Sequence, residues 1–164
     1  MFEDIEKRER HIKKWLTMNQ EELPFELNVY FGGKLVIRTK PDGIDVIDEE
    51  GRIKRVVDLI QKNLTDDLLR PRYRGLPGKY AGHCYVATEC FYYLYGREHS
   101  YKPKCFRYLN GDTHWWLEKD GDVLDITEEQ LSPGFDYSKG HSQFFMCYPS
   151  KRCKELARRA ENTA

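Results

Sequence analysis

A cysteine in the middle of the chain occupies the kind of position that a nucleophile needs. Cys84 follows the turn residue Gly82 and precedes residues 86–94, whose apolar side chains recur at helical spacing. A cysteine placed there begins a helix, where free backbone N–H groups and the helix dipole stabilise a negative charge. The thiolate is the nucleophilic form of cysteine. The sequence therefore predicts a reactive thiol at Cys84.

Two further residues can serve this thiol as a base and its orienting partner. His114 opens an alternating segment that ends at the turn of residues 119–122, and Asp125 closes the segment after that turn. The outer ends of the two strands of a hairpin lie side by side, so His114 and Asp125 are expected to be neighbours. A carboxylate in that place fixes the tautomer of the histidine. We therefore predict a catalytic triad of Cys84, His114 and Asp125.

The order of these residues resembles that of a known group of enzymes. Cysteine on a helix, histidine on a strand and aspartate on the next strand is the order of the transglutaminase-like and arylamine N-acetyltransferase branch of the papain-like cysteine enzymes. The motif H-x-W-x-E that begins at His114 and the motif D-x-T that begins at Asp125 are similar to the histidine and aspartate strands of that group. The likeness covers roughly residues 80–130.

This resemblance implies both a fold and a reaction. The fold is α+β, with a papain-like or transglutaminase-like core in which the nucleophile helix packs on an antiparallel sheet. The reaction is cysteine-dependent acyl chemistry on a protein, peptide or small amide substrate, or on a thioester: hydrolysis, deamidation or transfer through a thioester on Cys84. Papain-like peptidases carry a glutamine shortly before the cysteine, and residues 70–83 contain none. This difference speaks against peptide hydrolysis in particular.

The chain as a whole also resembles small uncharacterised proteins of bacteriophages. The likeness lies in G-H-C-x-V-A-T-E, which begins at Gly82, and in P-S-K-R, which begins at Pro149. Phage proteins of this size often act by binding a host protein. A non-catalytic protein-binding module on the same fold is therefore the alternative function, and the compartment implied by this likeness is the host cytoplasm.

The loop before the nucleophile supplies candidates for substrate contact. Residues 70–80 are rich in proline, glycine, arginine and tyrosine. In papain-like enzymes this segment commonly lines the substrate cleft, so the resemblance implies that Tyr73, Arg74 and Tyr80 contact the substrate. The alternative is a surface loop whose aromatic side chains are tucked in.

Stabilisation of an oxyanion needs two donors near the sulfur. The backbone N–H of Cys84 is the first, and the second stays open among His83, Tyr80 and the indoles of Trp115 and Trp116. Neighbouring residues on a strand face opposite sides of the sheet. One of the two tryptophans is therefore expected in the core and the other above the cleft.

The flanking segments predict the frame that holds these residues. Residues 1–51 predict an extension made of an N-terminal helix over 2–18 and a β-meander from residue 25 onward. Residues 52–164 predict the enzyme-like core, with the elements around the triad and a basic C-terminal helix capped by Ser150. These elements are a helix over 52–69, a strand over 103–109, an edge strand over 144–147 and the last helix over 151–160.

Composition excludes several classes of function. The 27 basic side chains balance the 27 acidic ones, which argues against a nucleic-acid partner. No window approaches the roughly 18 uninterrupted apolar residues of a membrane span. The first eight residues mix charges and lack the apolar centre of a signal peptide. Five cysteines are an odd number, which is atypical of a disulfide framework, so we expect a reduced, cytoplasmic protein without a cofactor.

A zinc site is the remaining alternative, because histidine and cysteine are numerous. The chain contains no C-x2-C pair, and the spacing between Cys147 and Cys153 is loose for zinc. The sequence therefore favours the triad over a metal site. The soft ligands considered were His83, Cys84, Cys90, Cys105, His114, His141, Cys147 and Cys153.

Overall fold

The computed structural model describes residues 28–31, 34–40, 43–46 and 49–163. The N-terminal helix predicted over residues 2–18 lies outside the described residues. The chain divides into two compact units, Met1–Arg55 and Val56–Ala164. Cys84, His114 and Asp125 all belong to the second unit.

The described part of the first unit contains a three-stranded antiparallel sheet. Its strands are β1 (Asn28–Phe31), β2 (Lys34–Lys40) and β3 (Gly43–Val46), in the order β1-β2-β3. Each strand pairs with its neighbour in the chain, because the short connections between them favour antiparallel pairing. The predicted β-meander is confirmed.

Helix α2 (Glu49–Lys62) follows this sheet and ends earlier than the sequence predicts. Glutamates stand in its first turn, where they suit the helix dipole. The side chain of Asn63 donates a hydrogen bond of 2.8 Å to the carbonyl of Leu59, and Thr65 takes an extended conformation. Residues 66–68 therefore form a separate 3₁₀ helix, Asp66–Leu68, rather than the last turn of a helix over 52–69.

The sheet of the second unit has four antiparallel strands in the order β6-β5-β4-β7. These are β4 (Lys102–Arg107), β5 (Thr113–Lys119), β6 (Asp122–Leu124) and β7 (His141–Ser142). The predicted edge strand over 144–147 is wrong. The pairing of β7 with β4 ends where the N–H of Gln143 donates to the carbonyl of Pro103 at 3.0 Å, and the following residues leave the sheet.

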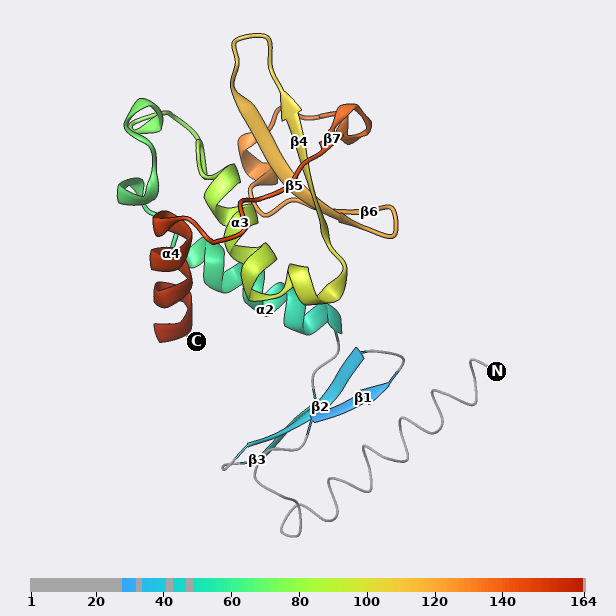
Figure 1. The fold of residues 1–164 in the computed structure, drawn as a ribbon. Coiled ribbons are helices and arrows are strands. Elements are labelled where there is room, and N and C mark those ends of the chain that lie inside the picture. Colours follow the sequence, from blue (N-terminus) through green and yellow to red (C-terminus); the bar gives the residue numbers. More distant parts are fainter. Residues whose placement is uncertain (1–27, 32–33, 41–42, 47–48, 164) are drawn as a thin grey trace. The chain divides into compact units, whose positions relative to one another are not determined.

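Helix α3 (Cys84–Leu94) lies between this sheet and helix α4 (Lys151–Asn162), as Figure 1 shows. The hydroxyl of Thr88 joins it to β5 through a hydrogen bond of 3.1 Å to the carbonyl of Trp115. The α+β class is confirmed. The core between the layers is built from side chains with little or no exposed surface, among them Val86, Cys90, Phe91, Trp116, Leu117 and Leu156.

The predicted cap of the last helix is confirmed, and it is tied to α3. The hydroxyl of Ser150 accepts the N–H of Cys153 at 3.1 Å. The buried carboxylate of Glu89 in turn accepts the Ser150 hydroxyl at 2.6 Å and its N–H at 3.0 Å. A buried carboxylate is stable only when its oxygens are hydrogen-bonded. Glu89 therefore has a structural role.

Short 3₁₀ helices make up much of the remaining chain. They are Pro71–Tyr73, Gly96–His99, Glu128–Gln130 and Tyr137–Lys139. Among the described residues, no helix has the length and apolar character needed to cross a lipid bilayer.

Candidate active site

The three predicted triad residues come from three adjacent elements of the second unit. Cys84 is the first residue of α3, His114 is the second residue of β5, and Asp125 directly follows β6. The antiparallel pairing of β5 with β6 returns the chain so that the carboxylate reaches the histidine ring. The structure therefore brings the triad together, as the hairpin pattern predicts.

Gly82 allows the chain to enter α3 at the required angle. Its φ is +78°, a left-handed conformation that side chains disfavour. A Cβ at this position would lie 2.7 Å from Cβ of Tyr73, closer than two carbon atoms can approach. The left-handed backbone and the close approach to Tyr73 both require a glycine at position 82.

His114 and Asp125 form a close, buried pair. Nε2 of His114 lies 2.6 Å from Oδ2 of Asp125, and their side chains are only 2% and 1% exposed. Oδ2 also accepts the hydroxyl of Tyr137 at 2.9 Å, and Oδ1 accepts the N–H of Thr127 at 3.0 Å. These hydrogen bonds satisfy a carboxylate that would otherwise be costly to bury. They also explain the D-x-T motif, because the threonine closes a turn onto the aspartate.

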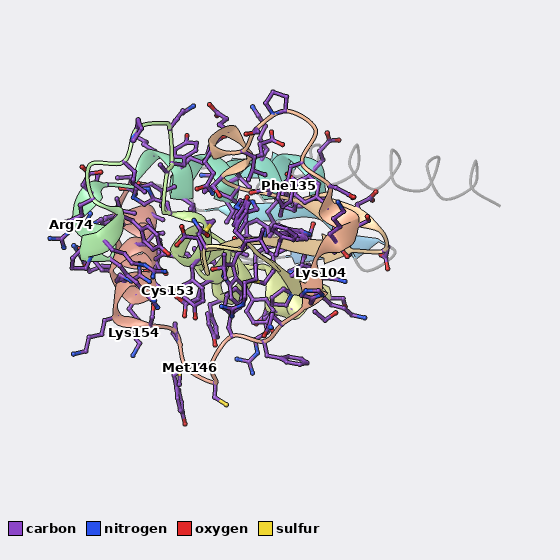
Figure 2. The ribbon with its side chains drawn as sticks, turned by 90° about the horizontal axis from the view of Figure 1, so that it is seen from above. Arg74, Lys104, Phe135, Met146, Cys153 and Lys154 are labelled. Atoms are coloured by element: carbon purple, nitrogen blue, oxygen red, sulfur yellow. The ribbon has the colours of Figure 1, made fainter. Side chains whose placement is uncertain are left out.

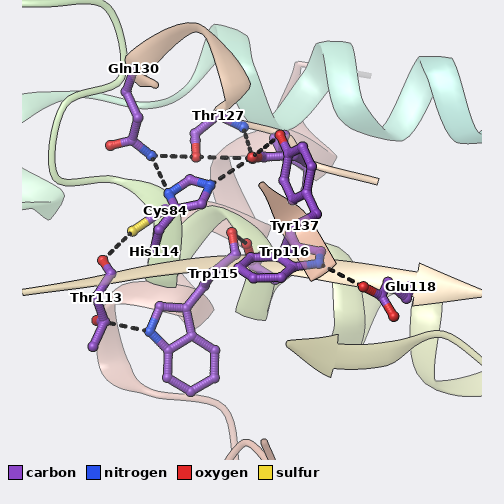
Figure 3. A network of polar contacts seen from close by, with 12 residues as sticks. Cys84, Thr113, His114, Trp115, Trp116, Glu118, Thr127, Gln130 and Tyr137 are labelled. Atoms are coloured by element: carbon purple, nitrogen blue, oxygen red, sulfur yellow. Dashed lines mark hydrogen bonds and ion pairs between the residues drawn. The ribbon is translucent and has the colours of Figure 1, made fainter. Parts of the chain in front are cut away.

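Cys84 lies on the other side of the His114 ring, beside Nδ1 (Figure 3). Its thiol donates to the carbonyl of Thr113 at 3.4 Å and is 7% exposed. Burial by itself lowers the pKa of His114, but hydrogen bonds with Asp125 and Cys84 outweigh it and raise that pKa to about 9. The two nitrogens of the ring therefore face the carboxylate and the sulfur, which is the arrangement that a base between them requires.

Gln130 completes this network and was not among the residues predicted from the sequence. Its Nε2 lies 3.2 Å from Nδ1 of His114 and 2.7 Å from the hydroxyl of Thr127. Its Oε1 accepts the backbone N–H of Gly82 at 3.2 Å. Because that N–H can only donate, the amide must point its oxygen to Gly82 and its NH₂ group to the histidine. The T-x-x-Q spacing from Thr127 to Gln130 matches a capping box and was the signal that could have found it.

A cavity of about 450 Å³ opens onto these groups. Cys84, His114 and Gln130 all line it, together with the backbone of Gly82. Aromatic and basic side chains form most of the remaining wall. The sulfur is therefore reachable from a space large enough for a small organic group. Tyr73, Tyr85, Tyr108, Trp115, Arg70, Arg72, Arg107 and Arg152 belong to this wall.

The predicted alternation of the two tryptophans is confirmed. Trp115 lines the cavity, stacks on Phe145 with ring centroids 5.4 Å apart, and donates its indole N–H to the hydroxyl of Thr113. Trp116 is fully buried on the opposite side of β5. It stacks against the ring of His114 with centroids 5.9 Å apart. Trp116 therefore packs against the ring of His114 and is not among the residues that line the cavity.

Of the other residues predicted to contact the substrate, one lines the cavity and three do not. Tyr73 lines the cavity, whereas Arg74, Tyr80 and His83 are not among the described residues that form its wall. Arg74 is exposed at the outer edge of its loop (Figure 2). His83 is buried, and its Nε2 lies 3.1 Å from the carbonyl of Thr65. Its second nitrogen, Nδ1, has no hydrogen-bond partner in the described part of the chain.

Within the described ranges, no three histidine, cysteine, aspartate or glutamate side chains are grouped so as to hold a metal ion. The zinc alternative thus has no ligand set in this part of the chain. Comparison of the chain with protein-family models, with curated proteins and with solved structures gives no match. What the cavity can do must therefore be inferred from its own side chains.

Proposed function

We propose that this protein is a cysteine-dependent acyl enzyme with a papain-like or transglutaminase-like core. One observation carries the proposal: Cys84 and His114 come from separate elements and line one cavity, and Asp125 lies 2.6 Å from the far nitrogen of His114. A nucleophile, a base and the partner that orients the base are the parts that covalent catalysis by cysteine needs.

The first half of the reaction forms a thioester. Nδ1 of His114 takes the proton of the Cys84 thiol, and the sulfur attacks the carbonyl carbon of an amide or thioester. The tetrahedral intermediate then breaks its bond to the leaving nitrogen or sulfur, which takes the proton from Nδ1. Asp125 keeps the other nitrogen protonated throughout, so the ring presents its lone pair to the thiol.

The second half returns the enzyme to its resting state. Water or an amine gives its proton to Nδ1 and attacks the thioester carbon. Collapse of the second intermediate expels the Cys84 sulfur, which recovers the proton. Water as acceptor gives hydrolysis or deamidation, and an amine gives acyl transfer.

Gln130 is the second oxyanion donor in this mechanism. While Nδ1 of His114 is unprotonated, it accepts the Gln130 amide N–H. When Nδ1 receives the thiol proton, two N–H groups face each other, and the amide donor is released toward the cavity. It then stabilises the oxyanion together with the N–H of Cys84, which has no acceptor within its own helix.

Alkylation tests the proposal without knowledge of the substrate. At pH 6–7, iodoacetamide is expected to modify Cys84 much faster than the exposed Cys147, because His114 lies beside the Cys84 sulfur and can take its proton. Peptide mass spectrometry measures the two rates in one sample. Equal rates, or slower reaction at Cys84, would contradict a catalytic role.

A protein-binding role is the second candidate, favoured by one surface feature. Phe144, Met146 and Tyr148 are 88%, 77% and 80% exposed in the segment after β7, and Met146 projects from the ribbon in Figure 2. Clustered exposed apolar side chains of this kind commonly mark contacts with another protein. An inert Cys84 in the alkylation experiment would leave this role as the better one.

A further inference from the structure

The cavity beside Cys84 is strongly basic, although the chain as a whole is electrically neutral. Its wall contains four arginines and a single acidic residue, Asp112. The arginines come from separate segments, and Arg152 is on α4. Balanced charge over the whole chain therefore conceals a local surplus of positive charge around the reactive sulfur.

Asp112 neutralises only one of these arginines. Arg72 lies 3.5 Å from Oδ1 of Asp112, and its guanidinium stacks on the ring of Tyr73 at 4.5 Å. The hydroxyl of Tyr73 donates to the same carboxylate at 3.1 Å. Arg70, Arg107 and Arg152 have no carboxylate partner among the residues that the structure describes. Three positive charges thus remain for whatever enters the cavity.

Arg152 is the most firmly placed of the three. It is half-buried, and its Nη1 donates to the carbonyl of Leu68 at 2.9 Å. Burial and the nearby charge of Arg70 lower the pKa of Arg152. Arg70 and Arg152 line the same cavity and repel each other, and the carboxylate of Glu89 offsets only part of this effect on Arg152. An oxyanion bound between the two guanidinium groups would relieve the remaining repulsion.

We propose that the substrate of this site carries a carboxylate or phosphate group close to its reacting carbonyl, and that Arg70 and Arg152 bind that group with support from Arg107. This substrate class rests on the proposed acyl chemistry at Cys84. The planar guanidinium presents paired donors that match both kinds of oxyanion. A cleft lined by one sign of charge also raises the rate at which ligands of opposite charge arrive.

Two alkylating reagents of nearly equal size separate the effect of the reagent's charge from the reactivity of the Cys84 sulfur. Iodoacetate and iodoacetamide both place a CH₂ group on sulfur and release iodide, and they differ in carrying a carboxylate or a carboxamide. At each cysteine we take the rate with iodoacetate divided by the rate with iodoacetamide. The measured quantity is this quotient at Cys84 divided by the same quotient at Cys147. We expect a value of about ten or more at low ionic strength, falling toward one in 0.5 M NaCl.

Arginine variants locate the effect. Arg70→Gln and Arg152→Gln should each lower the rate ratio several-fold, and the double variant should bring it close to one. Arg158→Gln is the matched control, because Arg158 also lies on α4 but pairs with Glu155 outside the cavity. It should leave the ratio unchanged. A wild-type ratio of one with rapid iodoacetamide reaction would overturn the anionic substrate class and leave the acyl chemistry standing.

Protection experiments distinguish a phosphate from a carboxylate ligand. Unfolding experiments test the anion site if Cys84 does not react. Inorganic phosphate or acetate, at matched ionic strength, should slow the reaction of Cys84 with iodoacetamide, and the stronger protector identifies the preferred group. If neither reagent modifies Cys84, the acyl chemistry is contradicted. Thermal unfolding then decides the anion site alone: phosphate or acetate should raise Tm in the wild type and not in the Arg70→Gln, Arg152→Gln double variant. No shift with either anion would overturn it.

Discussion

Gln130 holds the nitrogen of His114 that faces Cys84. Its Nε2 lies 3.2 Å from Nδ1, while the opposite nitrogen of the ring lies 2.6 Å from Asp125. In the neutral form of His114, both contacts together place the proton on Nε2. Gln130 therefore takes part in selecting the tautomer that can accept a proton from sulfur.

Replacement of Gln130 should impair turnover more than folding. Gln130→Ala removes the donor to Nδ1 and leaves the N–H of Gly82 without its acceptor. Loss of an oxyanion donor typically costs about 10²–10³ in kcat. An unpaired buried donor costs roughly 1–3 kcal/mol in the free energy of unfolding. Kinetics on a turned-over amide or thioester, together with urea unfolding, separate the two effects.

Gln130→Glu is the matched control for that variant. The glutamate keeps an acceptor for the N–H of Gly82 but brings a negative charge to Nδ1 of His114. We expect near-normal stability, a higher pKa for His114 and reduced kcat. Wild-type kcat in both variants would show that Gln130 neither selects the tautomer nor stabilises the oxyanion.

The carboxylate of Asp125 should control the charge of the base. Asp125→Asn removes the partner that raises the pKa of His114 and places an amide where Nε2–H and the Tyr137 hydroxyl need acceptors. In the serine protease triad, the same change costs about 10⁴ in kcat. A loss of 10²–10⁴ is expected here by analogy. The pKa of His114, followed by NMR, should fall in the same variant, and an unchanged value would refute the electrostatic role.

The free energy of unfolding should decline in mildly alkaline solution because of the pair formed by His114 and Asp125. The folded protein raises the pKa of His114 from an ordinary 6.5 to about 9. A raised pKa stabilises the fold fully below pH 6.5, and this contribution disappears as the pH rises through 9. The difference corresponds to roughly 3 kcal/mol. Urea unfolding of the wild type and of Asp125→Asn at pH 6 and pH 9.5 measures this loss. The free energy of unfolding of the variant should fall much less between the two pH values.

The sulfur itself should be dispensable for folding. Cys84→Ala removes a small side chain whose polar contacts are to the carbonyl of Thr113 and to the ring of His114. We expect complete loss of turnover and a change in unfolding free energy of about 1 kcal/mol. Cys147→Ala, at an exposed cysteine, serves as the control and should retain full activity. Activity retained in Cys84→Ala would mean that another residue is the nucleophile.

The triad could be predicted because its signals are local. Cys84 follows a glycine turn and begins an apolar helix, and the hairpin around Gly121 sets the register that brings Asp125 to His114. The α+β class was implied by the resemblance, in which a helix packs on an antiparallel sheet. The edge strand near residue 144 was misplaced because apolar character alone does not distinguish a paired strand from an exposed segment.

The wall of the cavity could not be predicted in the same way. Arg70, Arg107 and Arg152 come together only through the packing of a loop, a strand and a helix. His83 is adjacent to the nucleophile in sequence, yet its ring turns toward Thr65, because successive residues at a helix start point in different directions. Proximity in sequence is therefore a poor guide to which side chains share a cavity.

Gly82 provides a final test, since it links the loop of residues 70–80 to Cys84. Gly82→Ala should cost roughly 1–2 kcal/mol for the left-handed backbone, and more because its Cβ would lie 2.7 Å from Cβ of Tyr73. Gly121→Ala is the matched control: its φ is +88°, but a Cβ there would meet no atom within 4 Å. Unfolding in urea should show a clearly larger loss for Gly82→Ala. Alkylation of Cys84 should also slow in that variant alone, because the added atom displaces the turn that delivers the sulfur to His114. Equal losses in stability and unchanged alkylation would show that the close approach to Tyr73 does not position the nucleophile.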